Sequence, residues 1–172
     1  MNTEEQLEIV NEKGEVISLA PRSVIHGNPA LLHRVVHVLV FDRKGDLLLQ
    51  KRSMNKDVAP GKWDTSVGGH VGVGETLLVS AKRETEEELG ITDPELARLH
   101  SYIHRNPFET ELVTTYRCTF DGNINALPFN REEIDEIRFW SADEIEKAIG
   151  KQIFSDNFED EYRRYLETKK PL

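Results

Sequence analysis

The chain has 172 residues, a formal net charge of −9 and a hydrophobic content of 38%. These values indicate one globular domain, and the acidic balance disfavours binding to nucleic acid polymers, which requires a basic surface. No apolar run reaches the roughly 18 residues that span a membrane, and the N-terminal residues lack a signal-peptide pattern. The single cysteine, Cys118, excludes an internal disulfide, so we expect a cytoplasmic protein that does not enter a membrane. The oligomeric state stays open, a homodimer included.

Hydrophobic periodicity and turn residues divide the chain into alternating strands and helices. A hairpin is expected over residues 7–20, followed by a turn or short helix over residues 21–26. The expected strands are residues 31–41, 47–52, 98–104, 112–120 and 134–140, and the expected helices are residues 76–89, 141–149 and 156–168. Polar residues 53–62 and the glycine-rich residues 68–75 are expected to be a loop and a turn. This order predicts an α/β fold in which helices flank a mixed sheet, as one domain over residues 1–172.

Three glutamates share one face of the expected helix over residues 76–89. Glu84, Glu87 and Glu88 stand at positions i, i+3 and i+4, which lie next to each other on a helix surface. Carboxylates this close repel one another unless a cation lies among them. Oxygen ligands select a hard divalent ion, so the spacing points to Mg²⁺ or Mn²⁺ rather than zinc. The alternative interpretation is an exposed acidic helix face.

The segment from residue 69 to residue 91 resembles the box of the Nudix hydrolases, Gly-x5-Glu-x7-Arg-Glu-U-x-Glu-Glu-x-Gly-U. The matching residues are Gly69, Glu75, Arg83, Glu84, Glu87, Glu88, Gly90 and Ile91. Thr85 departs from the pattern, because the family has an aliphatic residue there. The resemblance implies an α/β/α sandwich and hydrolysis of a diphosphate linkage. It also implies that the Gly69 carbonyl joins the glutamates as a metal ligand, that Arg83 pairs with a box carboxylate and that Glu75 supports the turn.

Outside the box the chain is similar to the isopentenyl-diphosphate isomerases and the Nudix hydrolases related to them. That resemblance implies a metal site of three histidines and two glutamates, which here are His26, His33, His70, Glu109 and Glu111. Residues i and i+2 of a strand point to one face, so the glutamate pair is physically reasonable. Histidines with oxygen ligands suit Mn²⁺, Mg²⁺ or Zn²⁺. The alternative is that these are ordinary polar residues, as we expect for His37, His100 and His104.

Substrate contacts are implied by the same resemblance. Arg22, Arg52 and Lys56 stand where the family holds its diphosphate, although ordinary surface cations would look the same. Trp63 could stack on a base or ring, or pack in the core.

The residue at position 68 separates the isomerases from this chain. The isomerases carry a catalytic cysteine there, whereas this chain has Gly68, and Cys118 lies on a later strand as an expected small core residue. Loss of one of two proton-transfer groups disfavours isomerisation.

We therefore expect a metal-dependent Nudix hydrolase that acts on a nucleoside diphosphate derivative or a similar organic diphosphate. An isomerase-like enzyme and a non-catalytic nucleotide or sugar-phosphate sensor are the alternatives. The expected catalytic residues are Arg83, Glu87, Glu88 and Glu111. The general base is left open among Glu87, Glu111, Glu132 and Glu133.

Overall fold

The computed structural model describes residues 3–171, so Met1 and Asn2, on which the expected lack of a signal peptide partly rests, lie outside it. The strands are β1 (Gln6–Val10), β2 (Val16–Pro21), β3 (Leu32–Phe41), β4 (Leu47–Arg52), β5 (Trp63–Asp64), β6 (Val67–His70), β7 (Ala97–Arg105), β8 (Thr110–Thr119) and β9 (Ile134–Trp140). The helices are α1 (Arg22–Ile25), α2 (Leu77–Leu89), α3 (Ala142–Ala148) and α4 (Asp156–Thr168), with a 3-10 turn at Ile124–Ala126. Within these residues, no helix is both long and apolar enough to cross a membrane.

Strand β3 is the centre of the mixed sheet. It runs parallel to β8 over its whole length and antiparallel to β6, β4 and β1. Strand β7 extends the sheet beyond β8, and β9 pairs with β4. The parallel pair places His33 beside Glu111, and the antiparallel pair places His37 beside Gly68. Sheet pairing thus brings chemically active residues together from segments far apart in the sequence.

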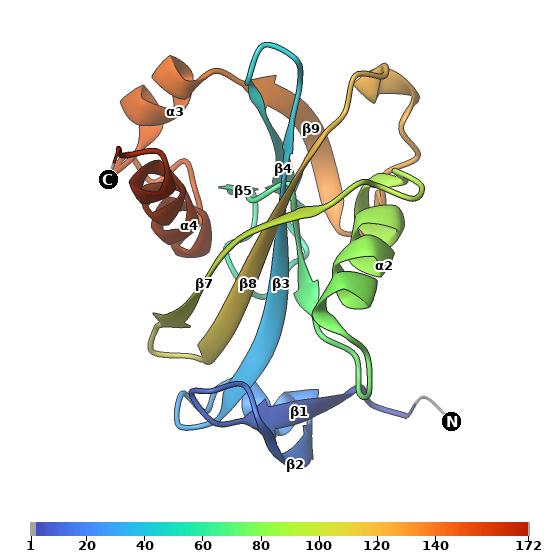
Figure 1. The fold of residues 1–172 in the computed structure, drawn as a ribbon, viewed down its shortest axis with the longest axis vertical. Helices are drawn as coiled ribbons and strands as arrows, with labels where there is room; N and C mark the ends of the chain where they lie inside the picture. Colours follow the sequence, from blue (N-terminus) through green and yellow to red (C-terminus); the bar gives the residue numbers. More distant parts are fainter. Residues whose placement is uncertain (1–2, 172) are drawn as a thin grey trace.

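Helices cover both faces of this sheet (Figure 1), with α2 on one side and α3 and α4 on the other. Successive β3 side chains point to opposite faces of the sheet. Val36, Val38 and Val40 pack in the cluster that includes Ala81 of α2. Leu39 and Phe41 pack in the cluster with the residues of α3 and α4. All five β3 side chains are buried, as expected for a strand covered on both faces. The expected α/β/α sandwich is confirmed.

Local signals place the helix ends correctly. The Thr76 hydroxyl accepts the Val79 N–H at the start of α2, and Gly90 ends the helix with a φ of 72°. Ser141 and Glu144 form a capping box at the start of α3, where the helix over residues 141–149 was expected. Thr85, the departure from the box pattern, is fully buried, and its hydroxyl donates to the Ala81 carbonyl, so the polar group is satisfied within the helix.

The glycine-rich segment differs from the expectation. Gly68, Gly69 and His70 belong to strand β6 and pair with β3, and the turn is limited to the residues between β6 and α2. Glycine has low strand propensity, so only the pairing with β3 reveals this strand. Because β6 is a strand, the backbone groups of Gly68 and Gly69 are held rigidly opposite α2.

Candidate functional site

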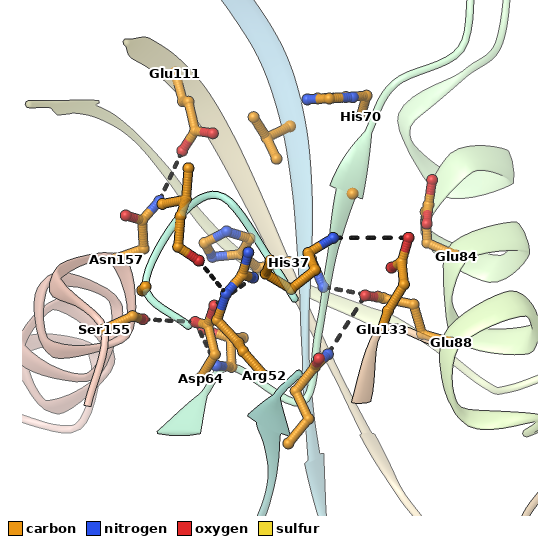
Figure 2. Close-up of a pocket in the computed structure, with 18 of the residues that line it drawn as sticks. His37, Arg52, Asp64, His70, Glu84, Glu88, Glu111, Glu133, Ser155 and Asn157 are labelled. Carbon is orange, nitrogen blue, oxygen red and sulfur yellow. Dashed lines mark hydrogen bonds and ion pairs between the residues drawn. The ribbon is translucent and has the colours of Figure 1, made fainter. Parts of the chain in front are cut away.

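A cavity of about 400 Å³ lies between α2 and the N-terminal end of α4 (Figure 2). Eight carboxylates line it, from Glu5, Asp64, Glu84, Glu87, Glu88, Glu109, Glu111 and Glu133. Four arginine or lysine side chains oppose them, from Arg22, Arg52, Lys56 and Arg83. This excess of negative charge can accommodate a phosphorylated ligand only with additional cations.

Two box glutamates are held against β6. The Gly68 N–H donates to Glu88 Oε2 at 3.0 Å, and the Gln50 amide donates to Oε1 at 3.4 Å. A Cβ on Gly69 would overlap the Glu84 carboxylate, so glycine is required for this approach. Burial, followed by the charge of Glu84, raises the pKa of Glu88 well above its usual value. Burial also raises the pKa of Glu84, against the opposing effect of Arg83.

Both carboxyl groups therefore favour the neutral form unless a cation lies beside them, so the pair fits a divalent metal ion. Glu87 lies outward, with 58% of its side chain exposed. In residues 3–171 the three glutamates do not form a group with all ligand oxygens within 4.8 Å. The expected cluster is therefore assembled in part: Glu84 and Glu88 face the sheet, and Glu87 stands at the cavity edge.

Arg83 and Glu75 support this arrangement. Arg83 contacts Glu75 at 2.9 Å, Glu84 at 2.8 Å and Glu87 at 3.2 Å. Glu75 also accepts the Gly72 N–H and the Ser80 hydroxyl, which ties the turn to the first residues of α2. Hydrogen bonds from Arg83 are the largest cause that lowers the pKa of Glu75 to about 2. Arg83 also donates to the His70 carbonyl of β6 at 3.3 Å, so the Arg83–Glu75 pair fixes the Glu84 rotamer against the sheet.

Three histidines and two glutamates converge at the other end of β6. Nitrogen atoms of His26, His33 and His70 lie within 4.8 Å of one another, and so do ligand atoms of His33, Glu109 and Glu111. His26 directly follows α1. His33 lies in β3, His70 in β6 and Glu111 in β8, and Glu109 directly precedes β8. The five residues predicted for this site are therefore neighbours.

The chemistry of this group fits a metal ion. Both ring nitrogens of His33 are buried with no hydrogen-bond partner in the described residues. Burial, aided by the charges of His70 and His26, lowers the pKa of His33 to about 3, so the ring is neutral and can ligate. Burial, followed by the charge of Glu109, raises the pKa of Glu111 to about 8. Imidazole nitrogens that converge with the Glu109 and Glu111 carboxylates form a donor set for a divalent cation.

Three of the four predicted substrate-binding residues line the cavity. Arg22, Arg52 and Lys56 all line the cavity, where their nearest carboxylates are Glu5 at 4.0 Å, Asp64 at 3.2 Å and Glu133 at 3.7 Å. Trp63 does not line it.

The Trp63 ring instead packs edge-on against Trp140, with ring centres 5.2 Å apart, beside the core cluster on the α4 side. Pairing of β5 with β4 turns this side chain toward the core, as in the alternative of core packing.

The structure adds residues that the sequence did not indicate. Asn157 of α4 donates to Glu111 at 3.0 Å, and Ser155 donates to Asp64 at 2.8 Å (Figure 2). Glu161 is fully buried beneath His37. Of these only Glu161 carried a signal, because it falls among the apolar positions of an amphipathic helix. Cys118 packs in the core on the α2 side, as expected, and burial raises its pKa to about 11.

Comparison with known proteins places this site in a family. The sequence profile of the NUDIX domain matches residues 31–161. The chain belongs to the Nudix family. Nudix membership, with the box intact on α2, supports a hydrolase.

Nudix relatives carry two kinds of name. An isopentenyl-diphosphate Delta-isomerase of Streptomyces avermitilis is 35% identical over 155 residues, covering 88% of this chain and 79% of that protein. The Nudix hydrolase YfcD of Escherichia coli is 36% identical over 143 residues, covering 82% of this chain and 76% of that protein. The crystal structure of DR0079 from Deinococcus radiodurans has the same fold, with a TM-score of 0.77, 28% identity and coverage of 93% of this chain and 98% of that one.

Proposed function

We propose that this protein is a divalent-metal-dependent hydrolase that cleaves a diphosphate linkage in a nucleoside diphosphate derivative or a similar organic diphosphate. The observation that carries the proposal is the Glu84–Glu88 pair. Both carboxylates are held against the β6 glycines inside an acidic cavity, where burial and neighbouring carboxylates raise both pKa values. A Mg²⁺ or Mn²⁺ ion supplies the missing charge.

The box residues have distinct roles in this proposal. Glu84, Glu88 and the Gly69 carbonyl would hold the ion, and Glu87 would join them from the cavity edge. The chemistry that such an ion supplies is neutralisation of phosphate charge and a lower pKa for the attacking water. Arg83 fixes the rotamer of Glu84 and contacts Glu87, and Glu75 fixes Arg83.

The His/Glu group provides a second ion site in the same cavity. His26, His33, His70, Glu109 and Glu111 would hold Mn²⁺, Mg²⁺ or Zn²⁺, as the donor types suggest. Glu111 is a candidate general base, in its deprotonated form. Glu87 and Glu133 are the other candidates that line the cavity. Glu132 does not line the cavity, so it lies away from the proposed reaction site.

Three cations complete the proposed substrate site. Arg22, Arg52 and Lys56 line the cavity around the two metal groups and would bind phosphate oxygens. Each has a carboxylate neighbour that would release it, in part, when a ligand binds.

A screen of nucleoside diphosphate derivatives and other organic diphosphates, with Mg²⁺ and Mn²⁺ titrated separately, tests the proposal. We expect phosphate or monophosphate release that requires the metal and saturates with it. Turnover that persists in excess chelator contradicts the metal dependence. Measurable binding without turnover, for every compound and either metal, replaces the hydrolase with a sensor.

A second candidate is isomerisation of an isoprenoid diphosphate, which the names of the Streptomyces relatives favour. Gly68 lacks the thiol of the isomerases, and Cys118 is buried in the core, away from the cavity lining. Deuterium uptake from heavy water into isopentenyl diphosphate would support this candidate. We expect none.

A further inference from the structure

His37 is the histidine at the floor of the cavity. It belongs to β3, and its Nδ1 atom lies 3.1 Å from Glu161 Oε1, with Glu161 fully buried in α4. Glu161 is also bonded to His100 Nε2 at 2.7 Å and to the Thr115 hydroxyl. Figure 2 shows His37 between the α4 side of the cavity and β6. The carboxylate therefore holds the imidazole from behind.

The other edge of the His37 ring faces the cavity. A Cβ on Gly68 would lie 3.4 Å from His37 Cδ2 and 3.6 Å from Nε2, and both residues line the cavity. Within residues 3–171, His37 Nε2 makes no hydrogen bond. This atom is also not one of the fully buried polar atoms without a partner, so it is accessible. A side chain at position 68 would stand beside this edge, so glycine keeps Nε2 open to the cavity.

His37 is also placed to be charged. Burial alone would lower its pKa, but the hydrogen bond to Glu161 and the charges of Glu161, Glu111 and Asp64 raise it. Hydrogen bonds from His100 and His37 overcome the effect of burial and lower the pKa of Glu161 to about 2. The raised pKa favours the protonated ring, and because Nδ1 faces Glu161, the Nε2–H points away from that carboxylate.

The remaining cavity cations do not have this geometry. Arg52 and Lys56 face Asp64 and Glu133, and these carboxylates also line the cavity. A ligand must compete with those carboxylates for the same N–H groups. The Glu161 carboxylate, which is bonded to His37 Nδ1, lies on the far side of the ring, and Glu161 does not line the cavity. His37 can thus donate to a ligand without breaking an ion pair.

We propose that His37 is a substrate-binding residue whose Nε2–H donates to an anionic phosphate oxygen of the diphosphate, and that Glu161 is its positioning residue. This proposal rests on the proposed hydrolase and adds a contact on the side of the cavity opposite α2. The ligand class is a diphosphate anion, because a charged N–H donor beside two metal-binding groups favours a phosphate oxygen over a neutral group.

His104 supplies a matched control. Its Nδ1 atom lies 2.8 Å from Asp160 Oδ2, so it makes the same kind of contact between the sheet and α4. It does not line the cavity, and its Nε2 atom is buried. His37→Gln and His104→Gln therefore remove similar His–carboxylate contacts, and only the first removes a donor to the cavity.

The binding test uses methylenediphosphonate with Mg²⁺, measured by calorimetry. We expect His37→Gln to weaken binding about tenfold, as for the loss of one charge-assisted hydrogen bond, and His104→Gln to change it less than about twofold. Glu161→Gln should weaken binding in the same direction, and the double variant should bind no more weakly than His37→Gln alone. Equal affinities for wild type and His37→Gln, or fully additive losses, would overturn the proposal.

A second measurement uses only the wild-type protein, so it does not depend on whether a variant folds. Imidazole nitrogen resonances of the wild-type protein, followed by NMR during a methylenediphosphonate titration with Mg²⁺, should show a shift at His37 Nε2 and none at His104 Nε2. Saturating ligand that leaves His37 Nε2 unmoved would rule the contact out. A wild-type enzyme that hydrolyses no diphosphate would refute the proposed function instead, since the His37 contact is judged by binding alone.

Discussion

The two candidate metal groups are built in opposite ways. Glu84 and Glu88 lie one turn apart on α2, and both already have polar neighbours in Arg83, Gln50 and the Gly68 N–H. The five residues of the His/Glu group come from four segments, and the ring nitrogens of His33 have no hydrogen-bond partner among the described residues. A helix specifies the first group locally. The second exists only once β3, β6 and β8 are paired.

This difference predicts unequal roles. The box group is pre-formed and lies beside Arg83, so we expect it to be essential for the chemistry. The His/Glu group has buried nitrogens that gain partners only from a bound ion, so we expect that ion to contribute to stability as well as to activity.

The largest effect is expected for Glu88→Gln. The amide can still accept the Gly68 N–H, but the charge that holds the metal is lost, so kcat should fall by at least about a hundredfold. Thermal unfolding should change little, because the variant removes an uncompensated buried charge. Glu86→Gln, on the exposed face of the same helix, is the control and should stay within about twofold of wild type. Retained activity in Glu88→Gln would discard the box metal.

His33→Ala should separate the two groups by stability. Wild-type protein should be stabilised by Mn²⁺ at both groups, by about 2.7 kcal/mol for each site at a hundredfold excess over Kd. The variant should lose the share that belongs to the His/Glu group and keep the rest, as measured by thermal unfolding with and without Mn²⁺. His104→Ala should keep the full Mn²⁺ effect. A full effect in His33→Ala would show that His33 is no ligand.

The pH dependence of Mn²⁺ binding should sharpen the distinction. In the Glu88→Gln background, only the His/Glu group remains to be titrated. Glu111 binds metal as a carboxylate, and its pKa is raised to about 8, so protons compete below that value. His33, with a pKa lowered to about 3, does not compete near neutral pH. Affinity should therefore rise by up to about tenfold per pH unit until about pH 8 and level off above it. A constant affinity over this range would contradict the assignment of Glu111.

The smallest effect is expected at the cavity rim. Arg22 is half exposed, and its nearest carboxylate, Glu5, is 4.0 Å away. Arg22→Gln should raise KM about twofold to threefold and leave kcat unchanged, since exposed charge contacts contribute little. Steady-state kinetics at low and high salt would check this, because the difference between variant and wild type should shrink at high salt. A large fall in kcat would place Arg22 at the reacting phosphate.

Sequence reasoning succeeded where the signal is local. Thr76, Gly90 and the capping box of Ser141 fixed the helix ends, because each acts within one turn of its helix. The near-continuous apolar run over residues 31–41 is typical of a strand that is buried on both faces, as β3 is. The box spacing predicted that the carboxylates of Glu84 and Glu88 would share one face of α2.

Sequence reasoning failed where pairing between distant segments determines the local structure. Gly68 and Gly69 are strand residues only because β3 lies beside them, and Trp63 faces the core only because β5 pairs with β4. The convergence of the histidines followed from a family resemblance rather than from any periodicity. His37 was expected to be merely structural, and the residue that gives it a partner, Glu161, lies 124 positions away.

The central claim is that α2 and β6 together hold a divalent ion. Anomalous diffraction from a crystal soaked in Mn²⁺ tests it most directly. The account predicts a peak bounded by the Glu84 and Glu88 carboxylates and the Gly69 carbonyl. Protein that hydrolyses diphosphates with Mn²⁺ but shows no peak there at saturating metal would contradict it.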